Sequence, residues 1–156
     1  MAKGHPDYKV TVTTLGNNNK VAPFTLDIDA NTVVLNSFTR VLDSDPATFY
    51  KWTNNSVSQR TSTITFDLLS IKTISNIIVF FKVTEDQGTD ENRVIIDHSE
   101  DNSSFTELSN DDSPTSDQEF DKSFGNTKLR YLRIRHVTNN SSGSAVLQLH
   151  VVDIFE

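Results

Sequence analysis

The chain has 156 residues, a formal net charge of −7 and no cysteine. This length suits one domain with a buried core, and the absence of cysteine excludes a disulfide scaffold and a thiolate zinc site. The negative charge disfavours a nucleic-acid partner, and the longest apolar run, Ile77–Phe81, is too short to insert across a membrane.

Segments of β-forming residues follow one another along the chain and predict strands almost throughout. The first, Tyr8–Thr13, alternates with period two, and Gly16–Asn19 after it has the composition of a turn. The further strands are predicted at Val21–Ile28, Thr32–Phe38, Ser62–Leu68, Asn76–Val83, Arg93–His98, Ser104–Leu108, Glu119–Phe124, Lys128–Val137 and Ala145–Phe155. Many short strands joined by polar turns predict an all-β fold, an antiparallel β-sandwich or jelly roll.

The charged residues are unevenly distributed. The segment Glu85–Asp121 contains thirteen acidic side chains and one basic side chain, Arg93. The strand after it is basic, and Arg133 and Arg135 alternate onto its outward face. We expect these two side chains to lie against carboxylates of the acidic segment or of a neighbouring subunit. The acidic segment itself is typical of a solvated surface that resists aggregation.

The stretch from His98 to Leu108 predicts a hairpin. The apolar run Val94–Ile96 leads in, Glu100–Asn102 forms an acidic turn, and Phe105 begins the return strand. The stretch resembles the motif Y-S-x-D-G-x-x-W-T-x-L of the discoidin-like domains, which include the coagulation-factor type C and galactose-binding group.

Three more segments are similar to motifs of that family and occur in the same order. Val41–Trp52 resembles A-x-D-G-D-x-x-T-x-W, Ile64–Ile77 resembles I-x-I-D-L-G followed by I-x-x-I, and Leu129–Ile134 resembles A-R-Y-I-R-I. The resemblance implies a galactose-binding-like β-sandwich whose usual work is non-catalytic attachment to glycans, lipids or proteins. With the period-two alternation it predicts a core of Phe66, Leu68, Ile77, Val79, Phe105, Leu132, Ile134, Leu147 and Leu149.

The resemblance begins near residue 36. We expect a single domain in which residues 36–156 form the discoidin-like sandwich. Residues 1–35 are strand-rich, and they either add strands to the sandwich or form an arm that pairs with a neighbouring chain.

The resemblance also implies one structural calcium ion in the loop of residues 42–48. Asp43 and Thr48 match the acidic and hydroxyl positions of the motif, and Asp153 stands where relatives supply a late carboxylate. Carboxylates, hydroxyls and loop carbonyls are the ligands that calcium prefers. Ser44 replaces the glycine of the motif, and glycine is the residue that adopts a positive φ without strain. The alternative is that Asp43 only caps a turn.

Ligands of the family usually bind loops at one end of the sandwich, which implies residues 53–60, 84–91 and 137–144 here. No aromatic residue lies in these loops, which argues against stacking on a sugar ring. Trp52, beside the first loop, is expected to pack in the core. The polar candidates for ligand binding at this end are Arg60, Asp90, Asn92, His136, Asn139 and Asn140.

No motif of a hydrolase, a metalloprotease or a nucleotide-binding enzyme occurs in the chain, and we expect no enzymatic activity. No export signal is visible after Met1. A lone attachment module of this kind predicts a phage or viral virion surface component that serves in capsid decoration, a fibre or a tail. The expected partners are other virion proteins, further copies of the chain in a homo-oligomer, and glycans. The alternative is a cell-surface or secreted carbohydrate-binding module. Neither hypothesis involves nucleic acid or membrane insertion.

Overall fold

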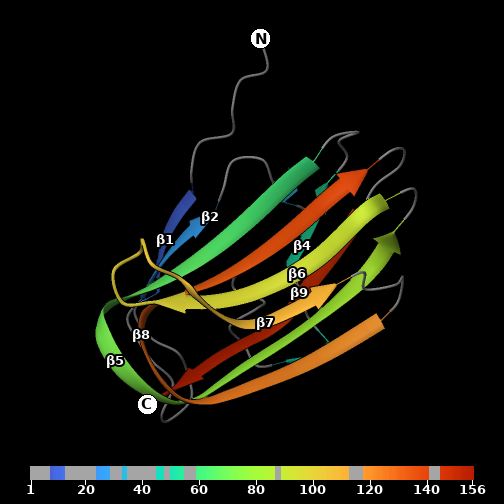
Figure 1. Ribbon diagram of the computed structural model, residues 1–156. Helices are drawn as coiled ribbons and strands as arrows, with labels where there is room; N and C mark the ends of the chain where they lie inside the picture. Colours follow the sequence, from blue (N-terminus) through green and yellow to red (C-terminus); the bar gives the residue numbers. More distant parts are fainter. Residues whose placement is uncertain are drawn as a thin grey trace.

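The computed structural model describes residues 8–12, 24–28, 33–34, 45–47, 50–54, 59–86, 89–112, 118–140 and 145–156. They form one antiparallel, nine-stranded sheet (Figure 1) made of β1 (Tyr8–Val12), β2 (Phe24–Ile28), β3 (Val33–Val34), β4 (Tyr50–Asn54), β5 (Gln59–Asp86), β6 (Thr89–Ser99), β7 (Thr106–Asp112), β8 (Gln118–Asn140) and β9 (Ala145–Phe155). The predicted all-β fold is confirmed. These residues include no helix that could span a membrane.

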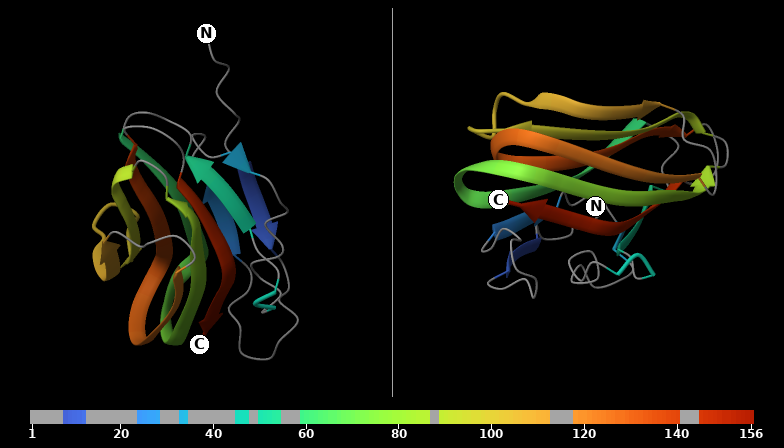
Figure 2. Two further views of the ribbon diagram at one scale, coloured as in Figure 1. Left: turned by 90° about the vertical axis from the view of Figure 1, so that its right-hand side faces the viewer. Right: turned by 90° about the horizontal axis from the view of Figure 1, so that it is seen from below.

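The two longest strands, β5 and β8, fold this sheet into the two layers of a sandwich. They pair with each other along nearly their whole length, and the pairing shifts between Asp67 and Lys72. Both strands bend back at this point (Figures 1 and 2), so each contributes one half to each layer. The sequence analysis predicted each as two separate strands, but the shift in register bends the ladder without ending it.

The remaining strands complete the layers. The first half of β5 and the second half of β8 share a layer with β2 on one side and with β6 and β7 on the other. The second half of β5 pairs with β9, which continues through β4 to β3. Strand β1 pairs with β2. The described N-terminal strands therefore add to the sandwich, and a pairing of this region with a neighbouring chain stays a prediction.

The core lies between the two layers and is formed by alternate side chains of each strand. The core residues predicted from motif and alternation are buried except Phe105, which is half-buried, and the side chain of Trp52 lies outside the described part. The ring of Phe105 packs under the guanidinium of Arg133, with 3.4 Å from Cζ to the ring centroid. The prediction was wrong for Phe105 because the hairpin return places this ring against an arginine of the outer face.

A polar contact closes the edge between β7 and the first half of β8. Nζ of Lys122 donates to Oδ1 of Asp111 at 2.6 Å. Leu108 and Phe124, one on each of these strands, pack against the core and stay partly exposed. The ion pair thus joins strands of opposite layers.

Candidate functional site

The starts of β5 and β6 and the end of β8 lie side by side at one end of the sandwich, and they carry the predicted ligand-binding residues. The pairing places Arg60 and Asn92 on either side of Thr138, in one row across the three strands. The next row outward contains Asn139, and His136 lies two rows inward from Thr138, on the same face of the sheet. The structure therefore brings these predicted residues together at the expected end.

The start of β6 contains a β-bulge at Asp90. Thr89 pairs with Asn140 and Glu91 pairs with Asn139, so Asp90 is the extra residue of β6 in this ladder. Bulges bend a strand and change the direction of its side chains, and they are frequent beside binding sites. Only the backbone of Arg60, Asp90 and Asn140 is described, and their side chains lie outside the described part.

The interior of the sandwich changes from apolar to polar toward this end. Ile64, Ile134 and Ile96 form an apolar row across β5, β8 and β6. In the next two rows on this face four buried side chains are polar, Ser62, His136, Asn92 and Thr138, and Val94 beside His136 is apolar. Buried polar groups destabilise a core unless they find hydrogen-bond partners. We therefore expect hydrogen bonds among these buried polar side chains or with their neighbours.

Asn92 and His136 make one of these hydrogen bonds. Their side chains are 2% and 0% exposed. Nε2 of His136 lies 2.9 Å from Oδ1 of Asn92, and it donates, because an amide oxygen only accepts. Burial lowers the pKa of His136 to about 3, so the ring is neutral at physiological pH. The sequence analysis placed both side chains in contact with a ligand, whereas here they bind each other beneath the surface.

Two further side chains at this end differ in their surroundings. Asn139 is partly exposed at the end of β8. Thr138 is fully buried, and its Oγ1 makes no hydrogen bond to any residue that the structure describes. Of the predicted ligand residues with described side chains, Asn139 is thus the one that reaches solvent.

The calcium prediction falls largely outside the described residues. Asp43 and Thr48 are not among them, and Asp153 is a buried residue of β9. The part of the chain that the structure describes contains no group of three or more side chains of the kind that hold a metal. Calcium binding by these three residues stays a prediction.

The described part of the predicted calcium loop is held by hydrogen bonds within the protein. Oδ1 of Asp45 accepts the backbone N–H of Ala47 at 2.9 Å, as in a turn. The carbonyl oxygen of Pro46 lies 2.7 Å from Nδ1 of His150, which donates to it. His150 also packs at 4.9 Å from the ring of Phe80. Nothing in the sequence indicates the contact between Pro46 and His150, because the two residues are 104 positions apart.

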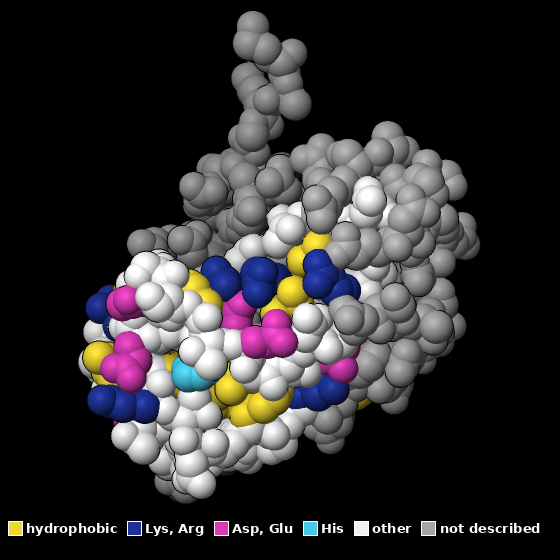
Figure 3. All heavy atoms as spheres, in the orientation of Figure 1, with side chains coloured by type: hydrophobic (Ala, Val, Ile, Leu, Met, Phe, Trp, Pro, Cys, Tyr) yellow, Lys and Arg dark blue, Asp and Glu magenta, His cyan; other side chains and the backbone are white. Residues whose placement is uncertain are grey.

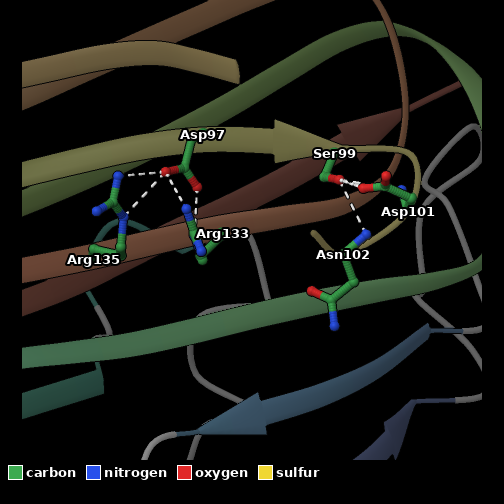
Figure 4. A network of polar contacts seen from close by, with 6 residues as sticks. All are labelled: Asp97, Ser99, Asp101, Asn102, Arg133 and Arg135. Carbon is green, nitrogen blue, oxygen red and sulfur yellow. Dashed lines mark hydrogen bonds and ion pairs between the residues drawn. The ribbon is translucent and has the colours of Figure 1, made fainter. Parts of the chain in front are cut away.

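The outer face of β6 and β8 carries a charged network (Figures 3 and 4). Asp97 is almost fully buried and accepts four hydrogen bonds from the guanidinium groups of Arg133 and Arg135, at 2.6–3.1 Å. Acidic and basic side chains are interspersed on the face that Figure 3 shows. The expectation that both arginines lie against a carboxylate of the acidic segment is confirmed.

The hairpin after β6 is built around one carboxylate (Figure 4). Asp101 accepts hydrogen bonds from the backbone N–H groups of Ser104 and Ser103 and from the hydroxyl of Ser99, and these lower the pKa of its carboxyl group. Figure 4 shows the contact with Ser99. Asn102 has φ of 62° and occupies the glycine position of the family motif. The hairpin therefore has the turn that the motif predicts, with asparagine as the tolerated substitute.

The bend of β5 has a similar turn and an unexpected surface. Oδ1 of Asp67 accepts a hydrogen bond from the backbone N–H of Leu69 at 2.8 Å. Both carboxylate oxygens of Asp67 also accept hydrogen bonds from Arg130. Leu69 has φ of 68°, again at a glycine position of the family motif. Leu69 and Ile71 are 44% and 48% exposed. Sequence reasoning missed this apolar pair, although the leucine in place of glycine was a signal for it.

The comparisons with known proteins agree with this architecture. The model of the F5/8 type C domain matches residues 35–149. The structure is similar to CBM32-1, a carbohydrate-binding module from a family 31 glycoside hydrolase of Clostridium perfringens, with 16% identity, TM-score 0.56, and coverage of 88% of this chain and 97% of that chain. No curated protein sequence matches the chain.

Two further solved structures have the same fold. The family 32 carbohydrate-binding module of Clostridium perfringens NanJ, in complex with galactose, is 12% identical with TM-score 0.52 over 85% of this chain and 93% of that one. A GH29 fucosidase of Ruminococcus gnavus, in complex with fucose, is 13% identical with TM-score 0.53, over 85% of this chain and 25% of the fucosidase. These likenesses establish the fold, and the family match establishes that the chain belongs to the F5/8 type C, or discoidin-like, domain family.

Proposed function

We propose that this protein is a non-catalytic carbohydrate-binding module that binds a sugar at the end where β5 and β6 begin and β8 ends. The observation that carries the proposal is the convergence of polar residues there, from three adjacent strands, in a domain whose main core cluster is apolar. The relatives of known structure include a module in complex with galactose. This supports the alternative of the sequence analysis over a virion component.

The chemistry of the residues at this end fits hydroxyl groups. Asn139 offers a donor and an acceptor, Asp90 offers acceptors, and Arg60 offers several donors in a fixed plane. Such groups pair with neighbouring hydroxyls of a sugar ring. The loops contain no aromatic residue, so we expect polar contacts to carry the affinity.

The other expectations about the setting of the module stay predictions. Assembly into a virion surface, a homo-oligomer and an extracellular location are compatible with a sugar-binding domain, and no comparison bears on them. The absence of enzymatic activity likewise rests on the resemblance to binding modules, some of which are parts of enzymes.

The proposal is tested on an array of immobilised glycans, followed by titration calorimetry with galactose and with the best-bound glycans. We expect selective binding to a subset of glycans, which Arg60→Ala and Asn139→Ala weaken by about tenfold or more, as expected for lost hydrogen bonds to a ligand. Lys128→Ala is the matched control, because Lys128 is exposed at the opposite end. Folded protein that binds no glycan, or equal losses in all three variants, would overturn the proposal.

A further inference from the structure

The hydrogen bond between Asn92 and His136 connects β6 to β8 along a diagonal. The direct partner of Asn92 in the ladder is Thr138, and the direct partner of His136 is Val94. The amide oxygen of Asn92 nevertheless bonds to His136, two residues further inward. A slip of one residue between the strands would turn Asn92 to the outer face and break this bond. The pair therefore specifies the register of the two strands.

The location of the pair gives that register a consequence for the site. The pair lies between the apolar rows of the core and the last rows of the sheet. Just beyond it, β6 has the bulge at Asp90, where one residue has no direct partner in the ladder. Bulged pairing is locally weaker than a regular ladder. Glu91 and Asn139 form the one row between the row of Asn92 and this bulge, so their position depends on the regular rows beneath them.

We propose that Asn92 and His136 are positioning residues that fix the ends of β6 and β8 for sugar binding, without touching the sugar themselves. The inference rests on the proposed function for the sugar, but the fixing of the strand ends can be measured without one. Both side chains are buried, so they act through Asn139 and the backbone of the bulge. Two residues that the sequence predicted to bind the ligand thus support the site from below.

The electrostatics of the pair support a constant geometry. Burial lowers the pKa of His136 to about 3, so the charge of the ring stays the same over the pH range in which proteins work. An ionised ring would be destabilised in this interior. Titration of the ring therefore does not alter the hydrogen bond to Asn92 in that pH range.

The experiment compares amide hydrogen exchange and galactose affinity in four proteins. These are the wild type, Asn92→Leu, His136→Gln and Ile74→Ala. Glutamine keeps a side-chain N–H donor at position 136, and Ile74 is a buried core residue at the bend, far from the pair along β5. Asn92→Ser, which keeps an oxygen on a shorter side chain, replaces Asn92→Leu if the latter does not fold.

We expect Asn92→Leu to speed exchange at Arg60, Glu91 and Asn139 and to weaken galactose binding by about tenfold or more. His136→Gln should keep most of the exchange protection at the strand ends and most of the galactose affinity. Ile74→Ala lowers the stability but leaves exchange at the strand ends and galactose affinity as in the wild type. The proposal is overturned if Asn92→Leu leaves exchange at the strand ends unchanged, or if Ile74→Ala affects the ends equally. A wild type that binds no sugar refutes the proposed function alone, because the exchange data still decide whether the pair fixes the strand ends.

Discussion

Asp67 holds Leu69 in a left-handed backbone conformation, through a hydrogen bond of 2.8 Å from the Leu69 N–H to Oδ1. The φ of 68° is unfavourable for a bulky residue, and the exposed side chain gains little by burial in return. Leu69→Gly should therefore raise the free energy of unfolding by about 0.5–1 kcal/mol, after allowance for the greater entropy of glycine in the unfolded chain. Urea denaturation measures this change.

Ile71→Gly is the matched control, because Ile71 is equally exposed in the same bend and is not among the residues with positive φ. This variant should lower the stability by about 0.5–1 kcal/mol, since glycine weakens a strand. If both glycine variants were destabilised alike, the left-handed conformation would not be the source of strain.

Asp97→Asn should destabilise the protein by about 2–3 kcal/mol. The carboxylate is almost fully buried and pairs with two arginines, and removal of one partner of a buried ion pair leaves charges uncompensated. The estimate lies below the range for fully buried pairs because Arg133 and Arg135 are partly exposed. Chemical denaturation gives the value, with Glu107→Gln as an exposed control on the neighbouring strand. A loss under about 0.5 kcal/mol would reduce the network to ordinary surface charges.

The stability should fall with pH in a window set by His136. The ring has its ordinary pKa of 6.5 in the unfolded chain and a pKa of about 3 in the folded protein. Unfolding therefore takes up a proton between these values, so stability decreases as the pH falls below about 6.5 and is unaffected above it. The slope is at most about 1.4 kcal/mol per pH unit.

The matched variant for this prediction is His136→Gln, which has no group that titrates at this position. Between pH 7 and pH 5, the wild type should lose about 1–2 kcal/mol more than the variant in urea denaturation. The other histidines and the carboxylates are common to both proteins and cancel in the difference. Parallel losses in the two proteins would show that His136 titrates normally.

The predicted calcium ion has its own thermal test. If Asp43, Thr48 and Asp153 bind calcium, the ion stabilises the folded state by about 2.7 kcal/mol at a hundredfold excess over Kd. Calcium should then raise the melting temperature, a chelator should lower it, and Asp43→Asn should remove the difference. Superimposed melting curves with calcium and with chelator would leave Asp43 as a turn residue.

The sequence predicts the core well where alternation and motif agree. Phe66 and Leu132 alternate with polar neighbours and face each other across β5 and β8. The same alternation, continued from Ile134, leads inward to His136 and Thr138. Their burial was therefore predictable, but the proximity of His136 to a loop favoured a ligand role for it instead.

The contacts that determine the site could not be predicted from the sequence. The hydrogen bond from His136 to Asn92 joins residues 44 positions apart, and it requires the pairing of β6 with β8, which no local sequence pattern indicates. The continuity of β5 through Leu69 was likewise hidden, since a leucine with positive φ has no distinctive sequence pattern. Only the position of glycine in the family motif indicates it.

The most direct test of sugar recognition at this end is a titration of ¹⁵N-labelled protein with galactose and with the best-bound glycan of the array, followed by NMR. The account predicts that chemical shifts change at residues 59–60, 89–92 and 138–140, and stay constant at the bend of residues 67–73. Shifts confined to the bend, or no shifts with any glycan at saturating concentration, would contradict it.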